Sequence, residues 1–288
     1  METKDLIKKI RRLEIKAKGL TKHIFSGEYH SAFKGRGMAF SEVRDYQIGD
    51  EVRTIDWNVT ARYNSPHVKV FDEEREMTVM LLIDISGSQN FGTKDKSKRE
   101  LASEIAALLA FAAVSNNDKV GAILFSSEIE KYIAPEKGSK HALRILHDLL
   151  EFKPKHSGTS IKSCLEFHRN TQKKRTITFV LSDFNDANNF LDAFKLTRKK
   201  HDTLAIQLAD HSEMNLPKMG LVQLFNAETS TTTWVNSDGE KVREKFAEIF
   251  KAKSEALKKD FQRSGIEHVT CFTDQDIIQP LTALFNNR

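Results

Sequence analysis

The sequence is poor in cysteine, proline and tryptophan, with two, five and two residues among 288. Two cysteines, Cys164 and Cys271, are too few for a disulfide-stapled fold. Neither lies in a C-x-x-C motif or at metal-ligand spacing from a histidine. Because both fall within apolar patterns, we expect buried free thiols, as in a reducing cytosol.

No hydrophobic run is long enough to cross a bilayer as a helix. Met77–Ile83 is too short, and Leu101–Val114 is interrupted by Ser103 and Glu104. The N-terminal residues have no apolar stretch that would indicate a signal peptide. We therefore expect a cytoplasmic protein without direct membrane insertion.

The net charge is only +5, from 45 Lys and Arg against 40 Asp and Glu. Positive charge is densest over residues 4–22, which carry eight Lys or Arg and two acids. Such a stretch can bind nucleic acid, acidic lipid or an acidic protein, or it can be the solvated face of a helix. Because zinc-finger spacing and aromatic RNA-binding motifs are missing, we expect the helix face and no nucleic-acid partner.

The hydrophobic pattern predicts strands that alternate with helices from residue 77 onward. The expected strands span residues 77–85, 119–125, 128–133, 175–183, 203–208 and 266–272. The expected helices span residues 95–115, 139–151, 159–170, 187–200, 239–263 and 275–285. This alternation is typical of parallel βαβ units with helices on both faces of one sheet.

We therefore expect an α/β, doubly wound (Rossmann-like) domain with a mostly parallel sheet over residues 77–288. Two alternating segments near residues 219–236 predict a β-hairpin insertion. Residues 1–76 are expected to pack on this domain. They combine an amphipathic helix over residues 4–18 with an irregular segment containing short strands such as His67–Phe71.

Polar side chains follow two of the buried strands. Asp84 and Asp183 stand at strand ends, Ser86 and Ser88 follow the first, and Thr159 lies in a turn between the two strands. Ligands of open parallel sheets bind at such ends, and an all-oxygen set suits Mg²⁺, or another divalent cation such as Mn²⁺ or Ca²⁺. The alternative reading gives Ser86, Ser88 and Thr159 turn or helix-cap roles and gives Asp183 an Asx-turn.

These five residues match, in order, the metal-ion-dependent adhesion site of von Willebrand factor A domains, whose pattern begins Asp-x-Ser-x-Ser. The resemblance implies a von Willebrand factor A-like fold over residues 77–208 plus the last strand and helix. It also implies that the serines and the threonine bind the metal directly and that the aspartates act largely through water. An Asp or Glu of a partner protein would complete the coordination.

Residues 27–76 carry a second resemblance. The string from Gly35 to Trp57, including Gly49-Asp50 and Ile55-Asp56-Trp57, is similar to the signature of a bacterial family of unknown function. Members couple this segment to a von Willebrand A-like domain and accompany MoxR-type AAA+ ATPases. The match continues into Phe71-x-Glu73-Glu74-Arg75-Glu76.

This resemblance implies a non-enzymatic adaptor or co-chaperone that serves a MoxR-type ATPase in the maturation of other protein complexes. The second partner would be a client protein that offers an acidic side chain. The candidate partner-binding residues are Arg44, Asp50, Arg53, Asp56 and Trp57. Alternating arginines and acids in this segment equally fit an internal salt-bridge network, and Trp57 fits a core anchor better than an exposed contact.

The alternative function is a metal-dependent, phosphatase-like hydrolase with Asp84 as the nucleophile. Haloacid dehalogenase-type phosphatases place a second acid two residues further on, where this chain has Ser86. The sequence also contains no G-x-S-x-G elbow and no phosphate-binding P-loop. We therefore expect that the chain is not an enzyme.

Overall fold

A computed structural model describes residues 3–20, 39–63, 65–72, 77–92, 96–186, 188–214, 216–226 and 231–286. The chain divides into two units, one of residues 1–33 with 78–288 and one of residues 34–77. The expected boundary between residues 76 and 77 lies one residue from that between the units. The N-terminal helix, which we had grouped with residues 1–76, belongs to the larger unit.

A six-stranded sheet forms the centre of the larger unit, in the order β10-β7-β6-β3-β4-β5. Its strands are β3 (Thr78–Asp84), β4 (Lys119–Phe125), β5 (Ile129–Glu136), β6 (Ile177–Ser182), β7 (Asp202–Ala209) and β10 (His268–Phe272). Only the edge strand β5 runs antiparallel to its neighbour. The predicted mixed α/β architecture with a mostly parallel sheet is confirmed.

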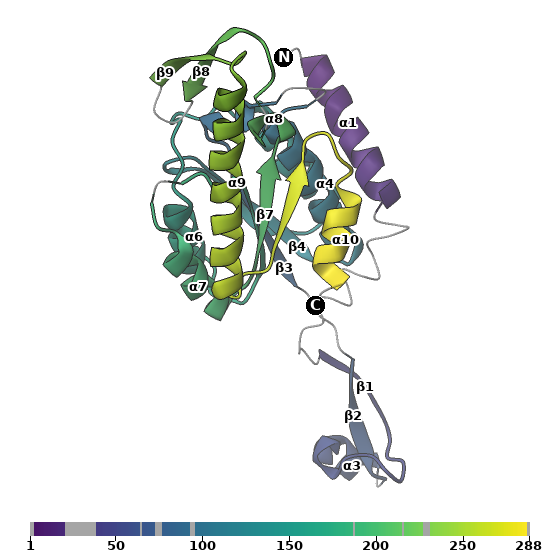
Figure 1. Cartoon of the computed structure of the whole chain (residues 1–288). Coiled ribbons are helices and arrows are strands. Elements are labelled where there is room, and N and C mark those ends of the chain that lie inside the picture. The colour runs from purple at the N-terminus through teal and green to yellow at the C-terminus, as the bar shows by residue number, and fades with distance from the viewer. Residues whose placement is uncertain are drawn as a thin grey trace. The chain divides into compact units, whose positions relative to one another are not determined.

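Helices cover both faces of this sheet, which explains why β3 is apolar along nearly its whole length and buried from Val79 to Asp84. On one side lie α4 (Lys98–Ser115), α5 (Ser139–Glu151) and α10 (Ile278–Asn286), and on the other α6 (Ile161–Thr171), α7 (Leu191–Lys200) and α9 (Glu240–Arg263), as Figure 1 shows for the labelled helices. Phe261 of α9 is fully buried against Phe184 and Phe194.

The N-terminal helix α1 (Thr3–Leu20) packs against α4, as its amphipathic pattern predicted. Leu13 and Ala17 are buried, and the helix also contacts α5. Two of its basic side chains reach acids of α4: Lys9 pairs with Glu100, and Lys16 lies 3.3 Å from Glu104. At least part of the basic stretch therefore stabilises a helix–helix contact.

Two strands of the larger unit stand apart from the central sheet. β8 (Leu221–Asn226) pairs antiparallel with β9 (Thr231–Asn236), as the alternating pattern predicted, while the expected turn at residues 228–230 lies outside the described residues. The short helix α8 (His211–Met214) was not predicted, because four residues are too few to show a helical period. Among the described residues, no helix has both the length and the apolar character to span a membrane.

The smaller unit is built on β1 (Ala39–Asp45) and β2 (His67–Asp72), which pair antiparallel. Between them come a 3-10 turn, η2 (Val52–Thr54), and the helix α3 (Trp57–Tyr63). Of our expectations here, the strand at residues 67–71 is confirmed, whereas β1 and α3 were not predicted. The glycines at 35 and 37 and the acidic run at 73–76 lie outside the described residues.

Candidate metal centre

The five candidate residues lie at the end of the central strand β3 and in loops near it. Strand β3 lies between β6 and β4, and all three run parallel, so their carboxyl ends share one edge of the sheet. Asp84 is the last residue of β3, and Asp183 directly follows β6. This is the topological switch point, where the loops diverge to opposite faces and leave room for a ligand.

The Asp84 carboxylate is fully buried and held from two sides. The backbone N–H of Ser86 donates to its Oδ1 at 2.9 Å, and the Ser182 hydroxyl donates to its Oδ2 at 2.6 Å. Burial raises the pKa of Asp84 to about 7, and the nearby charge of Asp183 adds to that increase. Two buried carboxyl groups thus lie close enough to repel one another.

Ser86 precedes a short 3-10 turn, η3 (Gly87–Asn90), and Ser88 lies within it. Ser86 precedes the turn, but its side chain makes no capping hydrogen bond. Instead, its Oγ lies 3.2 Å from the Ser88 Oγ. The helix-cap alternative therefore does not account for the Ser86 hydroxyl, and both hydroxyls gather beside the carboxylates.

The loop that carries Thr159 is fastened to the turn after β3. Gly87 donates its backbone N–H to the Ser157 carbonyl at 2.9 Å. The same loop is also held to the end of β4, because the backbone N–H of Ser160 donates to the Ser126 carbonyl at 2.9 Å. Thr159 is 8% exposed. The N-cap of α6 is Ser160, whose hydroxyl accepts from a backbone N–H of the helix, so Thr159 is not the cap residue.

Asp183 is bound by a lysine that the sequence analysis did not single out. Lys98, the first residue of α4, donates from Nζ to the Asp183 Oδ2 at 2.7 Å and to the Glu213 Oε1 at 2.6 Å. The Lys98 side chain is 1% exposed. Burial raises the pKa of Asp183, but the charge of Lys98 and the hydrogen bonds from Lys98, Ser88 and Asn185 together outweigh burial and lower that pKa.

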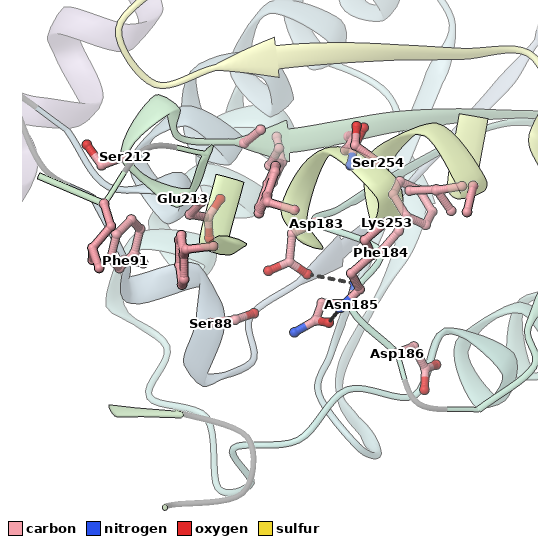
Figure 2. A pocket seen from close by; sticks show the side chains of 18 of the residues that line it. Ser88, Phe91, Asp183, Phe184, Asn185, Asp186, Ser212, Glu213, Lys253 and Ser254 are labelled. Carbon is pink, nitrogen blue, oxygen red and sulfur yellow. Dashed lines mark hydrogen bonds between the residues drawn. The ribbon is translucent and has the colours of Figure 1, made fainter. Parts of the chain in front are cut away.

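Asp183 also accepts the backbone N–H of Asn185 at 3.2 Å, which is the Asx-turn arrangement of the alternative reading. The Ser88 hydroxyl stabilises the same carboxylate. Figure 2 shows Ser88 and Asp183 side by side on one wall of a cavity. The Asx-turn therefore exists together with contacts that place Asp183 in the site.

Gln89 is a second side chain that sequence reasoning missed. Its Nε2 lies 3.4 Å from both the Asp84 Oδ2 and the Ser88 Oγ. Its Oε1 is buried and, within the described part of the chain, has no hydrogen-bond partner. A buried amide oxygen without a partner costs free energy, and such an acceptor beside a cluster of oxygens fits a site for a hydrated cation.

The backbone is strained next to this cluster. Phe184 has φ 56° although it is buried and carries a bulky side chain. The left-handed region is unfavourable for such a residue and recurs at functional sites. Here the strained conformation directly follows Asp183, and Phe184 packs against Phe190 and Phe261.

The candidate partner-binding residues all lie in the smaller unit. Arg44 and Asp50 form a two-pronged ion pair, with both N–O distances 2.8 Å, which fits the salt-bridge alternative. Asp56 accepts the backbone N–H groups of Asn58 and Val59 at the start of α3.

The exposure of Trp57 corrects an expectation from the sequence. Its side chain is 66% exposed, so the expectation of a core anchor is wrong. The chain packs Val68, which is 2% exposed, inside this small unit and leaves the larger indole outside. Arg53 is exposed as well.

Clusters of acidic, histidine and cysteine ligands do not mark the site. Across the described residues, no group of three or more His, Cys, Asp or Glu side chains is arranged to hold a metal ion. The candidate set differs from such a group because hydroxyls outnumber carboxylates. Both cysteines are buried and free, as expected.

Comparison with known proteins identifies the chain at the family level. It is similar to uncharacterized proteins of Mycobacterium tuberculosis and Mycobacterium bovis, each 26% identical over 281 residues that cover 97% of this chain and 88% of theirs. The fold is similar to that of the conserved hypothetical protein BatB from Bacteroides thetaiotaomicron, with a TM-score of 0.50 and 15% identity over 73% of this chain and 98% of that one. The model of the protein family of unknown function DUF58 matches residues 42–256. The chain therefore belongs to the DUF58 family.

Proposed function

We propose that this chain is a non-enzymatic protein-interaction module with a von Willebrand factor A-like domain, which binds partners through a divalent cation. The observation that carries the proposal is the gathering of Asp84, Ser86 and Ser88 beside Asp183 at the switch point of the sheet. The loop with Thr159 is hydrogen-bonded to the same turn.

The residues at this edge fit a hard cation. Carboxylate and hydroxyl oxygens are the ligands that Mg²⁺, Mn²⁺ and Ca²⁺ prefer. Ser86, Ser88 and Thr159 would hold the ion directly, and Asp84 and Asp183 would hold its water ligands. The unpartnered Oε1 of Gln89 adds a buried oxygen next to this set. When bound, the ion supplies a positive charge that attracts an anionic side chain.

The charge of Lys98 favours a cation that completes its coordination with an anionic group of a partner protein and not with a further side chain of this chain. Its ammonium already neutralises part of the charge of Asp183 and Glu213. A cation in the site would therefore be less fully neutralised by the protein. An Asp or Glu of a client protein would supply the missing negative charge, as the adhesion-site resemblance implies.

The second proposed partner is a MoxR-type AAA+ ATPase, which implies a cytoplasmic location. This part rests on the resemblance of residues 35–76. It is supported by the large apolar side chains that the smaller unit exposes, because exposed aromatic residues are frequent anchors at protein interfaces. These side chains are Ile48, Val52, Trp57 and Tyr63.

The test is mass-spectrometric comparison of the proteins captured from native lysate by the wild-type chain, with Mg²⁺ and with chelator, beside Asp84→Ala. We expect capture of a client protein with Mg²⁺ and its loss with chelator or in the variant, whereas the ATPase, which we assign to the smaller unit, should still be captured by Asp84→Ala. Because Asp84 is buried, Ser88→Ala serves as a second variant at a partly exposed position. Equal capture of the client protein by all samples would remove the metal from the proposed mechanism.

A further inference from the structure

A large groove continues from the candidate metal centre across the larger unit. Its volume is about 1020 Å³, and Ser88 and Asp183 are among the residues that line it. Figure 2 shows Lys253 and Ser254 of α9 across the cavity from Ser88. The volume lies at the upper end of the range of about 300–1,000 Å³ for small-molecule sites. A ligand that reaches the metal centre would therefore have room to extend well beyond it.

Away from the metal centre, the groove is mostly apolar. One face of α9 contributes Phe246, Phe250 and Leu257, whose spacing of four and seven residues places them on the same side of the helix. Ile249, the neighbour of Phe250, does not line the groove and is 61% exposed. Neighbouring apolar residues of α9 therefore differ, because Phe250 lines the groove and Ile249 lies on the surface outside it.

The apolar surface extends to the rim of the groove. Met219, which precedes the β8–β9 pair, is 68% exposed, and Phe91, after the metal turn, is 41% exposed. Exposed apolar side chains around a cavity that is itself apolar indicate a contact surface larger than a small molecule needs. A segment of another protein chain would be large enough to cover both the cavity and its rim.

The charge of the groove restricts which segment fits. Its lining includes four acids and one base. Lys98 lies behind the wall, where it is shared by Asp183 and Glu213. Outside the metal centre, the charge of the lining therefore comes from Asp186 and Asp260 against Lys253. This surplus of acid attracts positive side chains and repels negative ones. The acids are Asp183, Asp186, Glu213 and Asp260, and the base is Lys253.

We propose that the groove binds a partner segment that presents a single carboxylate to the metal centre and apolar and basic side chains to the rest of the groove. This inference rests on the proposed function, since the carboxylate needs the cation. It narrows the partner chemistry, because a run of acids would meet Asp186 and Asp260. In a segment with one acid among apolar and basic residues, the carboxylate would bind the cation and the basic side chains would pair with the acidic walls.

The test is selection of random short peptides displayed on phage against the full chain, with Mg²⁺ and with chelator. With Mg²⁺, we expect peptides that carry one Asp or Glu among apolar residues and Lys or Arg. A synthetic copy of a recovered peptide is then measured by fluorescence anisotropy. We expect Phe250→Ser to weaken its binding about 10-fold or more, as for an interface anchor, and Ile249→Ser to leave it unchanged. Circular dichroism verifies that both variants fold.

The outcomes separate the two proposals. Recovery of acidic runs, or equal effects of Phe250→Ser and Ile249→Ser, would overturn the inference while leaving a metal-dependent site intact. If Phe250→Ser weakens binding but chelator and Asp84→Ala do not, the proposed metal function fails. The groove would then select only the apolar and basic side chains of the partner segment. If no peptide is recovered under either condition, the groove does not bind a partner segment.

Discussion

The ammonium of Lys98 lies 2.7 Å from the Oδ2 of Asp183. A second contact of 2.6 Å joins it to Glu213, so one buried cation is shared by two carboxylates. The capping box of α4, in which Ser97 and Glu100 exchange hydrogen bonds, fixes the residue that precedes Lys98. The charge balance of the candidate metal centre therefore depends on the start of a helix.

We predict that Lys98→Met makes the stability of the chain depend on the metal. Removing one member of a buried ion pair typically costs about 3–5 kcal/mol, because the remaining charges lose their partner. A bound divalent cation would compensate for that loss, and it would no longer be repelled by the ammonium. In thermal denaturation, Mg²⁺ should therefore raise the midpoint of the variant more than that of the wild type.

Lys96→Met is the matched control. Lys96 pairs with Glu104 at 3.0 Å, outside the set of candidate ligands. In Lys96→Met, Mg²⁺ should change the midpoint of thermal denaturation as it does in the wild type. If Lys98→Met responded to Mg²⁺ no more than Lys96→Met, the electrostatic role assigned to Lys98 would be wrong.

We predict that Trp57→Ala weakens binding of the ATPase without destabilising the chain. Because the indole is 66% exposed, its removal should change the free energy of unfolding by less than about 0.5 kcal/mol. An exposed tryptophan that anchors a partner typically contributes about 2 kcal/mol or more to binding. Pull-down and denaturant unfolding measure the two effects separately.

Trp234 provides the comparison, since it is the other tryptophan and is 61% exposed on β9. Trp234→Ala should leave ATPase binding unchanged. Equal loss in both variants would indicate a general effect of surface tryptophans and would remove the smaller unit from the proposed interface.

We predict that the chain loses stability as pH falls from about 6.5 toward 4. His168 and His201 are buried side by side, with ring centroids 4.5 Å apart, and bond Thr178 and Thr176 at 2.9 and 3.0 Å. Burial lowers the pKa of His168 to about 3, with His201 and Lys200 adding to the effect. Burial, followed by Lys200, lowers the pKa of His201 to about 4.

The sign follows from the unfolded chain, in which histidine has a pKa of about 6.5. At pH values between the folded and the unfolded pKa of these histidines, the unfolded state binds more protons than the folded state. The stability that the two histidines contribute is therefore complete above pH 6.5 and decreases below it. Each histidine contributes a slope of up to about 1.4 kcal/mol per pH unit. Urea unfolding at several pH values should show a smaller slope in His201→Gln and an unchanged slope in the half-exposed control His147→Gln. The raised pKa of Asp84 contributes a slope of the opposite sign, which all three proteins share. A slope in His201→Gln equal to that of the wild type would therefore contradict the prediction.

The fold could be predicted because its strands are continuous apolar runs. Residues 77–85 and 175–183 read as buried strands and are buried as β3 and β6. Parallel pairing then requires the carboxyl ends to share an edge, which brings Asp84 and Asp183 together. The candidate site was therefore accessible from the order of strands and the residue types at their ends.

The residues that were missed depend on contacts between distant positions. Lys98 precedes Asp183 by 85 residues and Glu213 by 115, and a single lysine at the start of an apolar helix looks like an ordinary surface residue. Trp57 was misjudged for a related reason. Its size favours burial, but the smaller unit has too little interior to enclose it, and that depends on tertiary packing.

The central claim is that a divalent cation binds at the end of β3, and isothermal titration calorimetry with Mn²⁺ and Mg²⁺ tests it most directly. We predict binding of one ion per wild-type chain. In Asp84→Ala, the affinity should fall about 10- to 100-fold, as when the hydrogen-bond partners around a metal are removed. Circular dichroism must show that the variant remains folded. A wild-type chain that binds no ion, or a folded Asp84→Ala variant that binds it equally well, would contradict the account.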